Sequence, residues 1–470
     1  MCRWQHAQGQ SRIRIIGTRL SWVVAVVLFF SGAAWPAALG VAKRVAPAAA
    51  TLTPEDKAFV EDLSHRAFRF FVEQTDPGTG LVRDRARTTG AAVSGRSRDV
   101  ASIAATGFGL SALCIGAEHG WISRQNARSR VLQTLHFFAE RAPSEHGWFY
   151  HFMDARTGAR AWNSELSSID TALLVAGVLT GSQYFSNDRE ITSLSDAIYR
   201  RVDFPWMLNG DRYLFAMGWT RAKGFIPTRW DHYCELMILY MLAIASPTHP
   251  IPAESWHAWK RPPITYDNYH YIFGDFPLFV HQYAQAWIDF RGRREQKPPY
   301  IDWFENSVTA TLAQRAYCIR LHSKFPGYSE DIWGITSSDS VKGYVGWGGP
   351  PDDPRVDGTV VPCAPAGSLM FTPRESLAAL RKMKQLYGDR IYGRYGFGDA
   401  FNPSTGWVDP DVIGIDVGIT LISAENLSTG NVWTWFMRNG CIRAAMDRIG
   451  LTSSSGVAPN HVLPGGTLKP

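Results

Sequence analysis

Two carboxylates stand at the start of a short apolar run. Asp231 and Glu235 lie in the segment Trp230-Asp-His-Tyr-Cys-Glu235, and the apolar residues 236–245 follow. A helix over 230–245 would place both acids on one face, one turn apart. Carboxylates beside aromatic rings at the N-terminal end of a buried helix destabilise the fold unless they are paired with another polar group or serve a function. One interpretation is a sugar-cleaving site with paired carboxyl groups; the other is a helix-capping Asp and an ion-paired Glu.

Further acids precede apolar helices or lie among aromatic residues. Asp170 can simply cap a helix, and Glu425 can pair with a basic side chain. A helix N-terminus lowers the pKa of a nearby carboxyl group, whereas burial raises it. Glu235, predicted a turn inside its helix among apolar neighbours, therefore suits a general acid. Asp170, nearer a helix start, suits a base or a sugar ligand. The candidate acids are Glu165, Asp170, Asp231, Glu235, Asp339, Asp399 and Glu425.

Aromatic side chains are frequent in the predicted loops. An aromatic ring there can present its face to the C–H groups of a sugar while polar neighbours bind the hydroxyls. Ordinary loop packing is the alternative for each of them. The candidate sugar-binding side chains that accompany the acids are Trp230, Trp333, Tyr344, Trp347, Tyr395, Asn402 and Trp407.

The first 42 residues have the layout of a secretory signal peptide. Four Arg precede the apolar core 22–30, and small residues follow it. An uncleaved anchor is the alternative. Removing residues 1–40 lowers the formal charge from +6 to about +2, because four Arg and no acid are lost. A nearly neutral chain offers no electrostatic reason to bind nucleic acid. We expect a periplasmic or secreted protein with no membrane contact after cleavage and an uncharged partner.

The remaining chain is predicted to be a linker at 43–53, one domain at 54–450 and a disordered tail at 451–470. Its five cysteines are widely spaced and form no C-x-x-C pair, so we expect buried thiols. A bridge between Cys363 and Cys441 is unsupported by their spacing. No nucleotide-binding, zinc-protease or serine-hydrolase motif is present, so no metal or cofactor is expected.

Helical periodicity dominates the domain, and strand-like alternation is scarce. The segment 323–372 is the longest without helical periodicity, and its aromatic content favours a packed loop that lines a site. A helical solenoid is disfavoured because no fixed-period repeat occurs. This number of helices favours an all-α fold, an (α/α)6 toroid around a central cleft. The predicted helices are 54–73, 103–118, 125–141, 169–185, 191–202, 230–245, 274–289, 303–322, 373–386 and 432–449.

An ordered set of motifs resembles the bacterial glucoamylase-like family, which includes endo-β-1,2-glucanases. The motifs are Thr75-Asp-Pro-Gly-Thr-Gly-Leu-Val-Arg-Asp84, Ala101-Ser-Ile-Ala-Ala-Thr-Gly-Phe-Gly109, Gly147-Trp-Phe-Tyr-His-Phe152, Glu165 to Leu174, Ser246-Pro-Thr-His-Pro250, Trp333-Gly-Ile-Thr-Ser-Ser-Asp339, Tyr395-Gly-Phe-Gly-Asp-Ala-Phe-Asn402 and Glu425-Asn426. The transglycosylation domain of cyclic β-1,2-glucan synthases is a related module. The resemblance spans residues 54–440 and departs mildly at Cys234, where Ser or another small residue is expected.

The resemblance implies an (α/α)6 barrel that cleaves a β-glucan with carboxylates and without an obligatory metal. By motif, Glu235 is the expected general acid, and Asp399 or Glu165 is expected to activate water. Inversion at the anomeric carbon is implied. An endo-β-1,2-glucanase is thus expected, with a β-glucan transglycosylase or a non-catalytic glucan-binding protein of the envelope as alternatives. A lyase acting on uronates is disfavoured, because acidic loops would repel an anionic polymer.

Overall fold

The computed structural model describes residues 52–453. The predicted signal peptide, most of the predicted linker and residues 454–470 lie outside this range. The predicted tail begins too early, because β17 (Leu451–Ser453) pairs antiparallel with β11 (Arg293–Glu295). No helix within 52–453 is long and apolar enough to cross a membrane. Within the same range every cysteine is a free thiol, Cys363 and Cys441 included.

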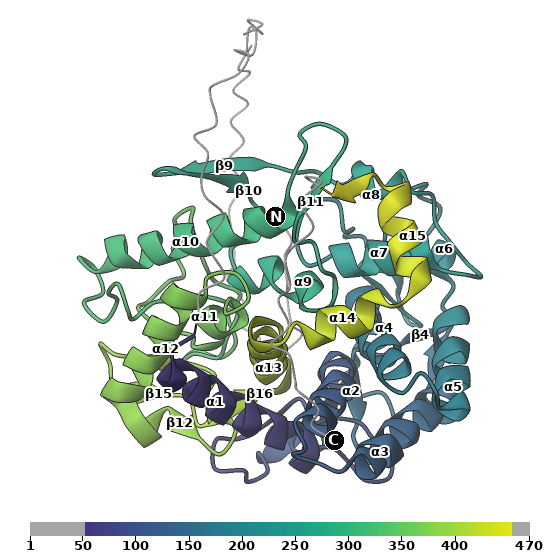
Figure 1. Ribbon diagram of the computed structural model, residues 1–470, viewed down its shortest axis with the longest axis horizontal. Helices are drawn as coiled ribbons and strands as arrows, with labels where there is room; N and C mark the ends of the chain where they lie inside the picture. Colours follow the sequence, from purple (N-terminus) through teal and green to yellow (C-terminus); the bar gives the residue numbers. More distant parts are fainter. Residues whose placement is uncertain (1–51, 454–470) are drawn as a thin grey trace, which may run out of the picture. The chain divides into compact units, whose positions relative to one another are not determined.

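A ring of inner helices forms the centre of the domain. Neighbours in the ring pack on one another, and α13 closes it by packing on both α11 and α2 (Figure 1). A short 3-10 turn, η3 (Leu278–His281), joins α9 to α11 in this ring. In the order of the ring, the inner helices of the described residues are α2 (Ile103–Glu118), α4 (Ser168–Tyr184), α7 (Met237–Ala245), α9 (Tyr283–Trp287), α11 (Cys363–Gly367) and α13 (Gly414–Ser428).

A second set of helices packs around the outside of this ring. Each of them contacts an inner helix or the turn that precedes it, so inner and outer helices alternate along most of the chain. The predicted all-α fold, an (α/α)6 toroid, is confirmed. The outer helices are α1 (Pro54–Glu73), α3 (Arg124–His136), α5 (Arg189–Arg200), α10 (Trp303–Leu321), α12 (Pro373–Tyr387) and α15 (Gly440–Arg448).

Outer helix α1 shows why the local sequence predicts these elements well. Thr53 caps its N-terminus in a capping box with Asp56, and Pro54 occupies the first helical position. Its apolar residues recur at helical spacing and form one buried face against α2 and α13. The structure therefore begins and ends this helix where the sequence predicts.

Short antiparallel strands connect the helices and direct the chain into the inner ring. Strands β2, β6 and β16 lead directly into α2, α4 and α13. The pairs are β1 (Arg85–Arg87) with β16 (Asp411–Ile413), β2 (Val100–Ser102) with β5 (Phe152–Asp154), β3 (Ser144–Glu145) with β4 (Trp148–Phe149), β9 (Pro263–Tyr266) with β10 (Tyr269–Ile272), β12 (Tyr392–Gly393) with β13 (Gly396–Phe397) and β14 (Phe401–Asn402) with β15 (Trp407–Val408); β7 (Gly218–Thr220) lies between β6 (Leu166–Ser167) and β8 (Gly224–Phe225).

Three predicted helices are wrong in extent, and two inner helices, α11 and α13, were not predicted; α11 lies in the segment 323–372 that was predicted as a loop. The predicted helix 230–245 starts only at Met237. The predicted helix 274–289 consists of η3 and α9, and 432–449 breaks into α14 (Asn431–Met437) and α15. Helix α13 was missed because it is apolar all round and rich in β-branched residues, which favour strands locally. The smaller elements are α6 (Phe204–Met207), α8 (Ser255–Ala258), η1 (Gly95–Ser97), η2 (Phe137–Arg141) and η4 (Gly388–Arg390).

Two glycines let the backbones of α2 and α4 touch. A Cβ added at Gly177 would lie 2.0 Å from the carbonyl oxygen of Gly107, and one added at Gly107 would lie 2.3 Å from the carbonyl oxygen of Leu173. Because both obstacles are backbone atoms, no side-chain movement can relieve the clash. We expect Gly177→Ala to lower the free energy of unfolding by at least about 2 kcal/mol in chemical denaturation.

Gly181 is the matched control one turn further along α4. A Cβ added there meets only Val131, at 3.7 Å. Gly181→Ala should therefore stabilise the protein by about 0.5 kcal/mol or more, through the helix preference of alanine. Equal effects of the two substitutions would contradict the close backbone packing.

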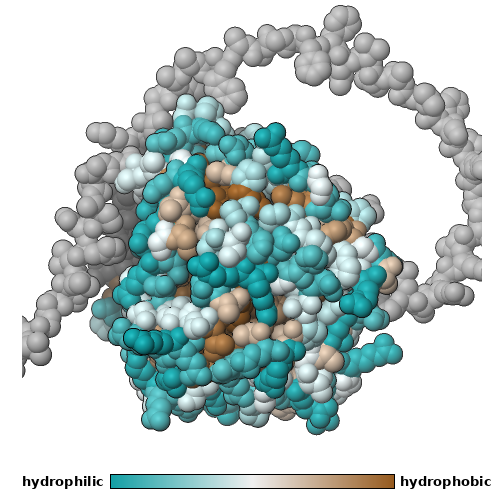
Figure 2. All heavy atoms as spheres, turned by 90° about the vertical axis from the view of Figure 1, so that its right-hand side faces the viewer, coloured by the Kyte–Doolittle hydropathy of each residue, from teal (hydrophilic) through white to brown (hydrophobic). Residues whose placement is uncertain are grey.

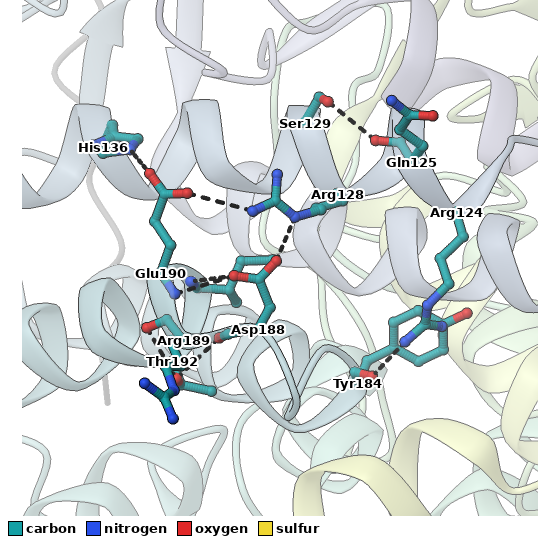
Figure 3. Close-up of polar contacts among 11 residues, drawn as sticks. Arg124, Gln125, Arg128, Ser129, His136, Tyr184, Asp188, Arg189, Glu190 and Thr192 are labelled. Atoms are coloured by element: carbon teal, nitrogen blue, oxygen red, sulfur yellow. Dashed lines mark hydrogen bonds and ion pairs between the residues drawn. The ribbon is translucent and has the colours of Figure 1, made fainter.

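The outer helices α3 and α5 are joined by a polar network (Figure 3). Asp188 caps α5 by accepting from the backbone N–H groups of Glu190 and Ile191, and its other oxygen accepts from Arg128 of α3. His136 Nε2 lies 3.0 Å from Glu190 Oε1, between the same two helices. The face that carries α5, α6 and α15 is mostly hydrophilic, with hydrophobic side chains in separate patches (Figure 2).

Candidate active site

Two acids occupy the same position in the two inner helices that flank α2 in the ring. Asp170 is the third residue of α4, and Asp416 is the third residue of α13. These helices start at the same end of the ring. A Cβ added at Gly414 would lie 3.0 Å from Ala105 near the start of α2, and the backbone of His151 bonds both Ile103 at the start of α2 and Glu165 just before α4. The ring therefore gathers buried acids at the N-terminal ends of its inner helices. Asp416 was not among the predicted site residues, and its position before an apolar run, like that of Asp170, is the signal that could have identified it.

One cluster is centred on His151, which the sequence motifs contain but which was not predicted as a site residue. His151 Nδ1 lies 3.0 Å from Glu165 Oε1, and His151 Nε2 lies 3.5 Å from Asp170 Oδ1. The Ser167 hydroxyl donates to Asp170 Oδ2 at 2.5 Å. Burial alone would lower the pKa of His151, but the carboxylates of Asp170 and Glu165 raise it to about 9. His151 is therefore a buried imidazolium that holds both predicted acids.

A second cluster surrounds Asp399. The backbone N–H of Asp339 donates to Asp399 Oδ2 at 2.7 Å. Burial, and then the negative charge of Asp416, raises the pKa of Asp399 well above its ordinary range. Burial also raises the pKa of Asp416, although hydrogen bonds from Asp399 and Cys363 lower it. Asp399 therefore carries the proton of this pair, and Asp416 carries the negative charge.

Arg85 on strand β1 neutralises part of this acidic cluster. Its guanidinium donates to Asp339 at 2.6 Å and to Asp84 at 3.2 Å, and it lies 3.7 Å from Asp411. Burial, and then the charge of Asp339, raises the pKa of Asp409 to about 7. One buried oxygen each of Asp399, Asp409 and Asp416 has no hydrogen-bond partner within the protein. Those of Asp409 and Asp416 can accept from a bound hydroxyl group, whereas the protonated Asp399 can donate to one.

Glu235 lies in the turn before α7 and not inside a helix. Its side chain is buried, and burial raises its pKa to about 7, although its own backbone N–H and the Cys234 thiol lower it by hydrogen bonding. The negative charges of Asp275 and Asp170 raise it further. Burial raises the pKa of Glu235 as expected, but the predicted position a turn inside a helix is wrong, because Glu235 precedes α7. The predicted shared helix face with Asp231 is wrong.

Tyr283 connects the Glu235 and Asp416 sides of the site. This buried side chain at the start of α9 lies within electrostatic range of both acids and of Tyr344. Tyr344 in turn lies near Asp416 and Asp399, and burial raises its pKa. The predicted residues Glu235, Asp170, Glu165, Asp339, Tyr344 and Asp399 are thus brought to one end of the ring, together with His151, Arg85 and Asp416.

Four of the predicted sugar-binding aromatic rings, those of Trp230, Trp333, Trp347 and Tyr395, are buried. Trp333 and Trp347 are 0% and 2% exposed, and the Trp347 indole donates to Ser338. Trp230 donates to the Ser168 hydroxyl at 2.8 Å and so fastens the Glu235 loop to α4. Tyr395 donates to Glu73. Trp407 remains partly exposed on β15.

Three predicted polar ligands also have structural partners. Glu425 lies near the far end of α13, nine residues or about 13 Å from Asp416, and accepts from Thr429 and Asn431 beside His119. Asp231 is paired with His232 and Lys260. The side-chain amide of Asn402 accepts from the backbone N–H of Ser404 and donates to the carbonyl oxygen of Asp357.

Two groups within the described residues have the donor spacing of a metal site. They are His151 with Glu165 and Asp170, and Asp339 with Asp399 and Asp409; in each group the donor atoms lie within 4.8 Å of one another. Each already contains or contacts a cationic side chain, namely His151 and Arg85 respectively. A metal ion would have to displace that charge, so the donor sets fit protein cations better than a metal.

Residues 227–440 match the Glycoamylase family model, which describes a glucoamylase. The chain is 27% identical to an endo-β-1,2-glucanase from Chitinophaga pinensis solved with sophorotriose and glucose, with a TM-score of 0.78 over 85% of this chain and 99% of that one. The chain resembles the glucoamylase-like family in sequence and in fold. The resemblance drawn from the motifs is confirmed.

A curated relative and a further structure agree with this family. An exo-β-1,2-glucooligosaccharide sophorohydrolase from Parabacteroides distasonis is 28% identical over 442 residues, which is 85% of this chain. The chain spans only 59% of the length of that relative. A crystal structure described as a glucoamylase from Bacteroides fragilis is 28% identical, with a TM-score of 0.77 over 87% of this chain and all of the other.

Proposed function

We propose that this protein is a glycoside hydrolase that cleaves internal linkages of β-1,2-glucan. The observation that carries the proposal is the buried Glu235, whose pKa is raised to about 7, in one site with the protonated Asp399 and the ionised Asp416. Glycoside hydrolysis requires one carboxyl group that keeps its proton at working pH and a second that does not. The names of the similar proteins support a β-1,2-linked glucan as the substrate.

In this proposal Glu235 donates a proton to the oxygen of the leaving sugar. Its pKa near 7 keeps a substantial protonated fraction at neutral pH, and its burial excludes water from the proton transfer. The carboxylate of Asp416, hydrogen-bonded by Asp399, accepts a proton from the attacking water or through a substrate hydroxyl. Glu165 is the alternative base, because the imidazolium of His151 keeps its carboxylate oriented.

A panel of linear β-1,2-, β-1,3- and β-1,4-glucans, with chromatography of the products, tests the proposal. We expect shortened β-1,2-linked oligosaccharides, and NMR of the first products should show inversion. Longer or cyclic products would instead indicate a transglycosylase. Tight binding of glucan without turnover would indicate a non-catalytic binding protein and overturn the proposed hydrolysis.

We also propose that the protein acts outside the cytoplasm. The support is the sequence of residues 1–42, with its Arg residues, apolar core and small residues. Fractionation of expressing cells and N-terminal sequencing of the mature protein test this. A cytoplasmic protein that retains residue 1 would contradict it.

A further inference from the structure

A partly exposed tryptophan lies next to the His151 cluster. Trp162 precedes Glu165 by three residues, and its ring packs edge-to-face on Phe152 at 4.8 Å between centroids. The Phe152 ring in turn stacks on His151 at 3.8 Å. A continuous row of rings therefore leads from the two acids held by His151 to a side chain that solvent can reach.

The backbone at this position is held in an unfavourable conformation. Trp162 and Asn163 both have positive φ, at 52° and 54°, although neither is glycine. This region costs a non-glycine residue roughly 1–2 kcal/mol. The Arg160 guanidinium maintains the turn by donating to the carbonyl oxygens of Asn163 and Ser164. Burial of the indole does not fully offset this cost, because Trp162 stays partly exposed.

Trp162 also contacts the segment that joins β1 to β2. Its indole Nε1 donates to the carbonyl oxygen of Arg96 at 3.3 Å. Arg96 belongs to η1, in the connection from β1 to β2, and β1 carries Arg85. The indole thus links the turn that leads to Glu165 with the connection between β1 and β2.

We propose that Trp162 is a sugar-binding platform of the active site, on which a glucose unit of the glucan stacks beside Glu165. This rests on the proposed function. The apolar C–H face of a glucopyranose ring complements an indole, and the carboxylate of Glu165 three residues away accepts from its hydroxyls. The turn then holds the indole toward the substrate in advance, which lowers the entropy lost on binding.

Kinetics of Trp162→Ala and Trp162→Phe on β-1,2-glucan test the platform. We expect Trp162→Ala to raise KM about tenfold with kcat within threefold of wild type, and Trp162→Phe to restore most of the affinity. Trp121→Ala is the matched control, because Trp121 is also partly exposed but stacks on His119 beyond the far end of α2. Melting temperatures and circular dichroism establish that each variant is folded.

Calorimetry with β-1,2-oligosaccharides in the Glu235→Gln background measures binding without turnover. We expect the added Trp162→Ala substitution to weaken binding about tenfold. Unchanged KM and Kd would overturn the platform but leave the proposed function standing. A fall in kcat with unchanged KM would do the same, because it would indicate that Trp162 only positions Glu165. Failure of the parent protein to bind any glucan would overturn the proposed function and the platform with it.

Discussion

Glu235→Gln is expected to lower kcat on β-1,2-glucan by about a thousandfold while KM changes only a few-fold. Gln keeps the shape of the side chain but cannot donate the proton that the leaving sugar requires, and general acid catalysis contributes about 10²–10⁴ in rate. The wild-type rate should fall as pH rises above about 7, where Glu235 loses its proton. Initial rates at saturating glucan across pH 5–9 measure both effects.

Glu425→Gln is the matched control for this substitution. Glu425 is also a buried glutamate, but it lies at the other end of α13 from Asp416. We expect its kcat to stay within about threefold of wild type, since it contacts none of the proposed catalytic groups. Release of oligosaccharide by Glu235→Gln at the wild-type rate, or an unchanged alkaline limb, would rule out Glu235 as the acid.

The protein should be more stable at pH 5 than at pH 8, by about 3 kcal/mol or more. The pKa of Glu235 is about 7 in the folded state against an ordinary value of 4.5, so its folded form holds a proton that the unfolded chain has lost. The stability that Glu235 contributes is complete below pH 4.5 and is lost as pH rises through 7. The difference of about 2.5 between its folded and unfolded pKa values corresponds to roughly 3 kcal/mol. His151 acts in the same direction, because its raised pKa makes its contribution complete below pH 6.5 and lost as pH rises through about 9. The buried His281, whose pKa is lowered to about 3, acts in the opposite direction and offsets His151, so that Glu235 dominates the difference.

Urea denaturation of wild type and two variants measures this pH dependence. Glu235→Gln should reduce the difference between pH 5 and pH 8, because it removes a group that must ionise in the interior. Asp231→Asn is the control: this partly exposed acid has a lowered pKa and should leave the difference unchanged. Greater stability at pH 8 than at pH 5 in the wild type would contradict the raised pKa values.

Much of the architecture follows from local sequence. Helix α1 has its capping residues, its proline and its apolar face within the segment itself, so its ends are predicted to the residue. Helix α13 carries no such pattern, because it is buried on all sides and its β-branched residues favour strands locally. Its burial depends on helices that are far away in the chain, and those contacts override its local preference.

The predicted site residues also divide into those that the fold brings together and those that it does not. Residue types, order and neighbouring aromatics were sufficient to select Glu235, Glu165, Asp170 and Asp399 and to suggest the family. The sequence also selected Glu425, Asp231 and four buried aromatic rings, because spacing along a chain does not reveal which end of a helix faces a site or which face of a ring is covered.

The protonation states and the grouping of the acids arise only from the folded arrangement. The pKa of Glu235 depends on the side chains that bury it and on Asp275, forty residues away. The proton that Asp399 holds beside Asp416 and the charge of His151 require the β13–β14 and β4–β5 connections to meet α13 and α4 at one end of the ring. Such energies depend on distance and burial in space, and separation along the chain does not encode either.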